Sequence, residues 1–410
     1  MCRRFLSSVP VLSAILVVGC QDEAAPDSEF AVRDSAGIEI VESSSPLLGP
    51  NAWTVSEEPV LEIGQVEGEE GYTFSGMAYD SEAGIGGVFR QEDGRIVVAD
   101  RRERTVRIFD SSGAFLEQFG RTGGGPGEFI SQPLACFQYG DRIAVTEMSR
   151  VSFFDPDGQF LERIDLQFGR AQIFGVFPDK SVLALSTIQG FNPLAPPSTG
   201  VYTDTGELWI IGPDGSASDR ADTINSKRTS LVREGEATYT LSQPFGSKLV
   251  LRVVSDEYVY GWPDHYELKV FDRTGAVRKI IRRSGDLLPV TAEDREWLTS
   301  LLENGMQEEM LRILTEGMTF PSHKAAFDRL LVDALGFFWV RTPARLGHWE
   351  WAGQPSPYWD VFDPSGRWLT SVTMPENVQI HDIGEDYILG VWQDELDVPY
   401  VRMYGLDRQE

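Results

Sequence analysis

Short runs of alternating apolar and polar residues, separated by turn-forming residues, fill most of this chain. In the clearest stretch, Asp93-Gly94 forms a turn and is followed by three predicted strands at Arg95–Asp100, Thr105–Phe109 and Ala114–Phe119. An apolar run before Asp93 supplies one more strand. Four short strands joined by tight turns predict an antiparallel meander, which is one blade of a β-propeller.

A five-residue motif, called the phrase below, recurs between pairs of runs that favour β-strands. It begins with an aromatic or aliphatic residue and ends with glycine. Asp can bond nearby backbone in such a turn and glycine can adopt positive φ, so the phrase predicts a turn inside each repeated unit. The copies are Phe109–Gly113, Phe154–Gly158, Phe271–Gly275 and Phe362–Gly366, with a weaker one at Ile211–Gly215 and a truncated one at Tyr404–Asp407.

Six units are predicted, and the last one lacks a fourth strand. The outer strand that it needs is predicted at Pro59–Gly64, which has no unit of its own. Adding that strand to the last unit removes an open sheet edge and closes the ring. The predicted fold of residues 30–410 is therefore all-β: a six-bladed β-propeller of four-stranded antiparallel blades closed by an N-terminal strand. The units span about 87–120, 133–166, 170–224, 237–283, 325–374 and 378–404.

The period breaks between the fourth and fifth units, where residues 284–322 predict a helical insertion. Thr291 and Asp294 have the spacing of a capping box, and leucines follow at helical spacing until Pro321. We expect the insertion to pack over a blade edge; a lid over one mouth of the central channel is the alternative.

The N-terminal residues predict export and lipid anchoring. Arg3-Arg4 precede an apolar run, Phe5–Val18, that is short for a membrane-spanning helix and typical of a signal peptide. The end of the run, Leu16–Cys20, resembles the bacterial lipobox, which implies a signal peptide over 1–19 and lipidation of Cys20. An ordinary signal peptide cut nearby is the alternative. Residues 20–29 are predicted to be a flexible tether, and the location to be the cell envelope, periplasmic or associated with the outer membrane.

Between the first two units, Gly120–Phe129 resembles the inter-blade signature of NHL-repeat propellers, and Asp93–Asp100 strengthens the match. The whole chain is similar to bacterial six-bladed lipoproteins of the TolB-like and NHL-repeat superfamily. The resemblance implies a binding platform, although some relatives are lactonases or lyases. Fold alone does not select between these roles.

The formal net charge is −27, which excludes a general affinity for nucleic acid because phosphate binding depends on Lys and Arg. The basic runs Arg101–Arg104 and Lys279–Arg283 are short and are expected to be solvated ends of strands. Cys136 stands among apolar residues and is expected to behave as a small buried hydrophobic residue.

Signatures of catalysis and of metal binding are sparse. The glycine-rich loop 123–127 lacks the Gly-Lys-Ser/Thr of a phosphate loop and is expected to let the chain cross between blades. Asp100, Glu147 and Asp333 are expected to cap turns. The four histidines are scattered, so no metal site and no cofactor are predicted. Weak Ca²⁺ binding at Glu67–Glu70 is the alternative to a solvated loop.

The strongest candidate ligand-binding residues are His348, Trp349 and Trp351, in a loop-like segment of the fifth unit. Exposed aromatic rings beside polar groups suit contacts with sugars or peptides; packing of this segment as a hairpin on the sixth unit is the alternative. The nearby Trp339, Trp359 and Trp368 are expected to pack inside a blade.

The predicted function is an envelope-anchored platform that binds a protein, peptide or glycan. A hydrolase or lyase with a metal or acid–base site at the channel mouth, and a purely scaffolding role, are the alternatives.

Overall fold

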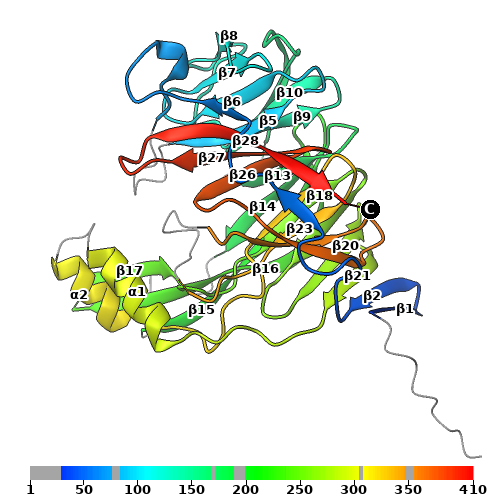
Figure 1. Ribbon diagram of the computed structural model, residues 1–410, viewed down its shortest axis with the longest axis vertical. Helices are drawn as coiled ribbons and strands as arrows, with labels where there is room; N and C mark the ends of the chain where they lie inside the picture. Colours follow the sequence, from blue (N-terminus) through cyan, green and yellow to red (C-terminus); the bar gives the residue numbers. More distant parts are fainter. Residues whose placement is uncertain are drawn as a thin grey trace, which may run out of the picture.

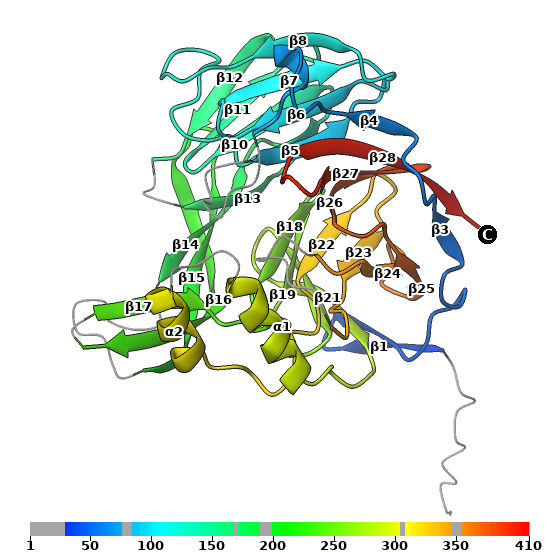
Figure 2. The same cartoon turned by 60° about the vertical axis from the view of Figure 1, so that its left-hand side comes forward.

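The computed structural model describes residues 29–75, 84–167, 171–188, 199–235, 237–303, 308–346 and 355–409, and these form six sheets of a six-bladed β-propeller. The first strands of the blades gather at the centre (Figure 2), where β5 contacts β9 and β26, and β18 contacts β13 and β22. Blade 1 has β5 (Ile85–Arg90), β6 (Ile96–Asp100), β7 (Thr105–Phe109) and β8 (Phe115–Phe119). Blade 2 has β9 (Ala135–Tyr139), β10 (Arg142–Glu147), β11 (Arg150–Phe154) and β12 (Phe160–Asp165).

The other four blades follow in chain order. Blade 3 has β13 (Gln172–Val176), β14 (Val182–Ile188), β15 (Gly200–Ile211), β16 (Ala217–Glu234) and an added β17 (Ala237–Ser242). Blade 4 has β18 (Val250–Val254), β19 (Glu257–Gly261), β20 (Glu267–Asp272) and β21 (Val277–Arg283). Blade 5 has β22 (Arg329–Val332), β23 (Phe338–Arg341), β24 (Tyr358–Phe362) and β25 (Trp368–Thr373). Blade 6 has β26 (Val378–Ile383), β27 (Tyr387–Gln393) and β28 (Pro399–Arg408).

The recurring phrase forms the turn between the third and fourth strands of a blade, as predicted. Asp110 Oδ1 accepts hydrogen bonds from the backbone N–H groups of Ser112 (2.8 Å) and Ala114 (2.9 Å), and Gly113 has a φ of 85°. That conformation favours glycine because other residues meet steric strain there. The predicted truncated copy at Tyr404–Asp407 is wrong: those residues lie inside β28, which continues to Arg408 because it pairs with an N-terminal strand.

Blade 6 is completed from the N-terminus, which closes the ring. Two short strands pair with β28: β4 (Leu61–Ile63) with its middle and β3 (Trp53–Val55) with its end. The predicted closing strand at Pro59–Gly64 is therefore confirmed, and β3 extends the closure beyond it.

The end of β28 is locked by Arg408. Its guanidinium donates to Asp333 Oδ2 (2.8 Å) and to the carbonyl of Gly384 (2.6 Å), and it lies over the rings of Trp53 and Trp339. The Asp333 side chain is fully buried. The contact joins blades 5 and 6 to β3.

Three features differ from the predicted blades. The fourth unit does not begin near 237: residues 237–242 form β17, because β15 and β16 outgrow their blade and β17 pairs with the extension. A hairpin of β1 (Phe30–Ser35) and β2 (Ile38–Ser43) adds to blade 4, with β2 parallel to β21. Residues 325–327 lie outside the strands, and blade 5 begins at Arg329.

Buried apolar side chains fill the spaces between neighbouring sheets. Between blades 1 and 2, Val97 and Val106 pack with Phe129 and Phe154. Trp339, Trp359 and Trp368 are buried, which confirms their predicted packing role. Cys136 is also buried and unpaired, and burial raises the pKa of its thiol. Each sheet thus buries its faces against its neighbours, as a repeated architecture requires.

The contact at Arg408 yields a prediction about stability. Arg408→Met should lower the free energy of unfolding by about 3 kcal/mol, because it leaves the buried Asp333 carboxylate without its cation. The same substitution at Arg33, whose ion pair with Glu42 is solvent-exposed, should change stability by less than about 1 kcal/mol. Urea unfolding of both variants checks this. Equal effects at the two positions would show that Arg408 is not a structural lock.

Candidate functional site

Two kinds of connection lie on one face of the propeller. The first kind is the turn that joins the second and third strands of a blade. The second is the link from the fourth strand of one blade (strand d) to the first strand of the next (strand a), and we call the face the d–a face after this link. In antiparallel blades both kinds leave from the same end of the sheet. They are bonded to one another: Ser75 N–H donates to Asp100 (3.0 Å), and Ser131 N–H donates to Glu147 (2.7 Å).

The predicted ligand-binding residues belong, in the sequence, to the segment that joins β23 to β24. His348, Trp349 and Trp351 lie between β23 and β24, outside the described residues, so their role stays a prediction. Cys20 also lies outside them.

The helical insertion occupies the d–a face, as α1 (Ala292–Glu303) and α2 (Glu308–Gly317). Both helices lie beside β15–β17 (Figures 1 and 2), and the backbone at Gly317 packs against Val232 of β16. Leu298 and Leu302 share a buried cluster with Phe245. The predicted packing role is thus confirmed, and its partner is the extension of blade 3. We call this extension and the two helices the wing (residues 200–204, 225–235, 237–242, 291–303 and 308–320).

A buried ion pair holds the wing to blade 5. Lys324 Nζ donates to Asp294 Oδ1 (2.6 Å) and to the carbonyls of Ala344 (3.0 Å) and Arg345 (2.9 Å). The other oxygen of Asp294 accepts from Thr291 N–H (2.9 Å), which confirms the predicted capping box at the start of α1. Because the Lys324 and Asp294 side chains are almost completely buried, this contact fixes the helix against the turn after β23.

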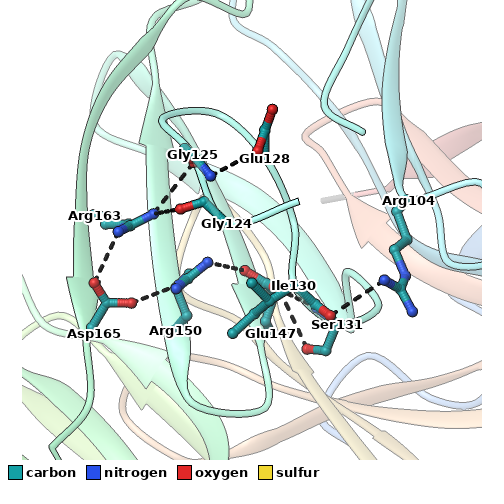
Figure 3. A network of polar contacts seen from close by, with 10 residues as sticks. All are labelled: Arg104, Gly124, Gly125, Glu128, Ile130, Ser131, Glu147, Arg150, Arg163 and Asp165. Atoms are coloured by element: carbon teal, nitrogen blue, oxygen red, sulfur yellow. Dashed lines mark hydrogen bonds and ion pairs between the residues drawn. The ribbon is translucent and has the colours of Figure 1, made fainter. Parts of the chain in front are cut away.

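The glycine-rich loop between blades 1 and 2 is held from both sides (Figure 3). Gly125 N–H donates to Glu128 Oε2 (2.7 Å), so this amide is occupied by the protein's own carboxylate. Arg163 Nη1 donates to the carbonyls of Gly124 (3.0 Å) and Gly125 (3.3 Å). The loop therefore receives a cation at its carbonyls, which suits a crossing between blades and not a phosphate cradle.

Charged groups continue from this loop into the interior (Figure 3). Asp165 accepts from Arg163 Nε (2.9 Å) and from Arg150 Nε (2.6 Å). Arg150 Nη1 then lies 3.8 Å from Glu147 Oε2, and neither of these two buried atoms has a hydrogen bond. Burial raises the pKa of Glu147, while the Ser131 N–H and Arg150 oppose that rise.

Of the three carboxylates predicted to cap turns, Asp100 and Asp333 do so, whereas Glu147 accepts from Ser131 of the neighbouring link. Asp100 Oδ1 accepts from the backbone N–H groups of Arg102 (3.1 Å) and Glu103 (3.0 Å). Asp333 Oδ1 accepts from Leu335 and Phe337 in the same way.

The stretch Glu67–Glu70, considered above as a weak Ca²⁺ site, is exposed over residues 67–69. In the described part of the chain no three His, Cys, Asp or Glu side chains gather as they would around a metal ion.

Exposed large apolar side chains concentrate on the d–a face. Leu396 is 75% exposed, and Ile130 is 50% exposed. Over the part of the chain that the structure describes, the opposite face carries fewer of them, and Leu335 is one. The residues that occupy or border the d–a connections are Val66, Ile130, Met148, Ile188, Leu346, Tyr358 and Leu396.

Sequence reasoning did not find this distribution, nor the role of Lys324. The exposed residues are scattered along the chain and share only their position in the blade, which becomes visible once the strand order is known. Lys324 carried no motif of its own. The capping box that marked Asp294 was the one available signal for that contact.

Comparison with known proteins supports the architecture. Residues 83–184, about a quarter of the chain, match a family model, DUF5128, described as a 6-bladed beta-propeller. No curated protein matches. Among the helices of the described residues, none is long and apolar enough to cross a membrane.

Solved structures resemble the chain at low identity. A putative exported protein from Bacteroides fragilis has 13% identity and a TM-score of 0.47, with 90% of this chain and 99% of that chain covered. Virginiamycin B lyase from Staphylococcus aureus has 8% identity and a TM-score of 0.39, covering 86% and 99%. A gluconolactonase from Xanthomonas campestris has 12% identity and a TM-score of 0.39, covering 86% and 100%. Similarity at this level carries no argument about activity.

The raised pKa of Glu147 predicts a pH effect on stability. Above pH 4.5, the ordinary glutamate pKa, Glu147 is ionised in the unfolded chain before it ionises in the folded one. Wild-type stability should therefore fall, relative to Glu147→Gln, as the pH rises through this window. Thermal unfolding of both proteins over a pH series measures the difference.

Glu162→Gln is the control of opposite sign. A hydrogen bond from Lys180 lowers the pKa of Glu162, so the wild type should lose stability relative to this variant as the pH falls below 4.5. If the Glu147 difference does not change with pH, the buried carboxyl does not titrate as described.

Proposed function

We propose that the protein is an envelope-anchored binding platform that holds a protein, peptide or glycan partner on its d–a face. The observation that carries the proposal is the concentration of exposed apolar side chains on this face. Apolar side chains exposed on one face can lose water-accessible area to a partner, and this favours association. The loops that carry it stand on a rigid ring of packed sheets, an arrangement that commonly presents binding residues.

Two further features support the same face. The wing rises beside the ring and is fixed by the buried Lys324–Asp294 pair, so it can contribute a preorganised wall to a binding surface. The connection that contains His348, Trp349 and Trp351 leaves from the same end of blade 5. We therefore include these three residues in the proposed surface.

An acid–base enzyme is the second candidate, and Glu147 is the residue that favours it. Its raised pKa and the lack of a hydrogen bond at Oε2 are properties of catalytic acids. However, Oε2 and the facing Arg150 Nη1 are both buried, so a substrate would first have to displace the turn that covers them. Binding without catalysis requires no such movement, and we favour it for that reason.

The binding surface is tested by charge substitutions on the two faces. Leu396→Asp together with Ile188→Asp should release most of the partner that co-purifies from envelope extracts, because each places a carboxylate where an apolar contact is expected. Leu335→Asp, at a similarly exposed position on the opposite face, should retain it. Trp349→Ala with Trp351→Ala tests the predicted loop in the same assay. Retention by every d–a variant, or equal loss with Leu335→Asp, would contradict the proposed surface.

The anchor is tested separately. Cys20→Ser should move the protein from the membrane fraction to the soluble fraction, because a lipid chain can attach only to the thiol. Cys136→Ser should remain with the membranes, since that cysteine is buried in blade 2. Fractionation and immunoblotting measure both. Continued membrane association of Cys20→Ser would disprove lipidation at Cys20.

A further inference from the structure

Blade 4 ends in an open strand. Its sheet has the order β18-β19-β20-β21-β2-β1, so β1 is the outermost strand and lies at the margin of the molecule (Figure 1). Among the described residues, β1 pairs with β2 and with no strand on its other side. Residues 31–35 are exposed, and Val32 is 53% exposed. An open edge of this kind is a template for pairing with another strand.

The hairpin turn decides which backbone groups of β1 are free. A two-residue turn at Ala36 and Gly37, with φ of 55° and 81°, joins β1 to β2. In such a hairpin the closing pair is hydrogen-bonded, and hydrogen-bonded pairs then alternate along the strands. The bond from Ser44 N–H to the Glu29 carbonyl (2.9 Å) has the same phase. The odd-numbered residues of β1 therefore bond β2, and the N–H and C=O groups of the even-numbered residues face outward.

The same N-terminal segment closes the outer edges of three blades but leaves its own first strand open. β2 adds to β21 of blade 4, and β3 and β4 add to β28 of blade 6. Between them, residues 47–51 bond β25 of blade 5, as in the bond from Leu47 N–H to the Trp368 carbonyl (3.0 Å). β1 itself has a continuous register with β2 and contains no proline, so neither a bulge nor a missing donor protects its free edge.

A second copy of β1 fits this edge in one register. In a two-fold antiparallel pair, each strand meets its own copy about one central residue. Centring the pair on Val32 is the single choice that places residues 30, 32 and 34 of both strands in hydrogen-bonded pairs, 32 with its counterpart and 30 with 34. Arg33 then lies opposite Ala31, and Asp34 lies opposite Phe30, so no like charges are directly opposed.

We propose that two copies of this chain pair through β1, antiparallel and centred on Val32, so that two six-stranded sheets become one. The pairing buries the exposed Val32 side chain against its counterpart and gives partners to the outward backbone groups. It goes beyond the proposed function, because it uses the outer edge of blade 4 and none of the residues assigned to the d–a face.

The lipid anchor makes so small a contact effective, and in this step the inference rests on the proposed function. Two six-residue strands form a small contact beside the roughly 1,200 Å² of stable interfaces, so pairing requires a high local concentration. Glu29 follows Cys20 by nine residues, which span at most about 32 Å. In the proposed pair the two Glu29 residues lie roughly 20 Å apart along the strands. Both chains can therefore reach the surface of one membrane.

Disulfide trapping of the full-length protein in membranes tests the pairing. Val32→Cys should give a linked dimer on mild oxidation, because hydrogen-bonded pairs hold their Cα atoms about 5.5 Å apart, within disulfide range. Val60→Cys is the matched control on the outer edge of blade 6, where Val60 is 63% exposed. It should give at least about tenfold less dimer, since its thiols meet only by collision. The native Cys136 is buried and does not compete.

Two further variants test the register and the backbone bonds. Arg33→Cys should not be trapped, because in the proposed register its counterpart lies diagonally, about 7–8 Å away. Val32→Pro removes an outward N–H and leaves the bonds to β2 intact, and proline is accepted at such edge positions. It should lose most of the dimer that formaldehyde traps in wild-type membranes, whereas Val32→Thr should retain it. Thermal unfolding checks that every variant is folded.

Several outcomes would overturn the inference. These are no linked dimer from Val32→Cys, as much dimer from Val60→Cys, more dimer from Arg33→Cys, or a linked product that contains a different protein. If trapping fails while Leu396→Asp with Ile188→Asp still releases the natural partner, the binding platform stands and the pairing is wrong. If the dimer forms but those substitutions release nothing, the pairing stands and the proposed surface is wrong.

Discussion

The structure depends on the burial of each sheet between two others, and therefore on closure of the ring. A blade on its own leaves two apolar faces in water, so the first and last blades must also find partners. Here the last blade is completed by residues from the other end of the chain, when β3 and β4 pair with β28. Arg408 fixes that junction by joining the buried Asp333 to the aromatic rings of blade 5 and β3.

A closed ring leaves its loops free to vary, and this chain has elaborated one face. The wing grows from two overlong strands of blade 3 and is joined to blade 5 through Lys324. The exposed apolar residues lie on connections that leave from the same end. The features that could contact a partner therefore share a face, while the rigid sheets behind them contribute stability.

Much of the architecture could be predicted because it follows from local chemistry. The Asp and Gly residues in the four full copies of the phrase form the turn that they specify. The Thr291–Asp294 pair begins a helix where a capping box predicts one. The pairing of β2 with β21 could not be predicted, since it joins residues more than two hundred positions apart without a shared motif. The length of β15 and β16 was also hidden, because the extension contacts elements outside the blade: β17 pairs with β16, and α2 packs against it.

The candidate site was harder to predict for a related reason. Tryptophans in a loop are visible in a sequence, which is why Trp349 and Trp351 were selected. The exposed residues Ile130, Ile188 and Leu396 come from three blades and meet on one face only after the sheets are assembled.

The most direct test of the account is site-specific photo-crosslinking in intact cells. A photoreactive amino acid would replace Leu396 on the d–a face or Leu335 on the opposite face, at comparable expression. The account predicts a discrete crosslinked product from position 396 and none from position 335. Crosslinking that is equal at the two positions, or that occurs only at 335, would contradict a binding platform built on the d–a face.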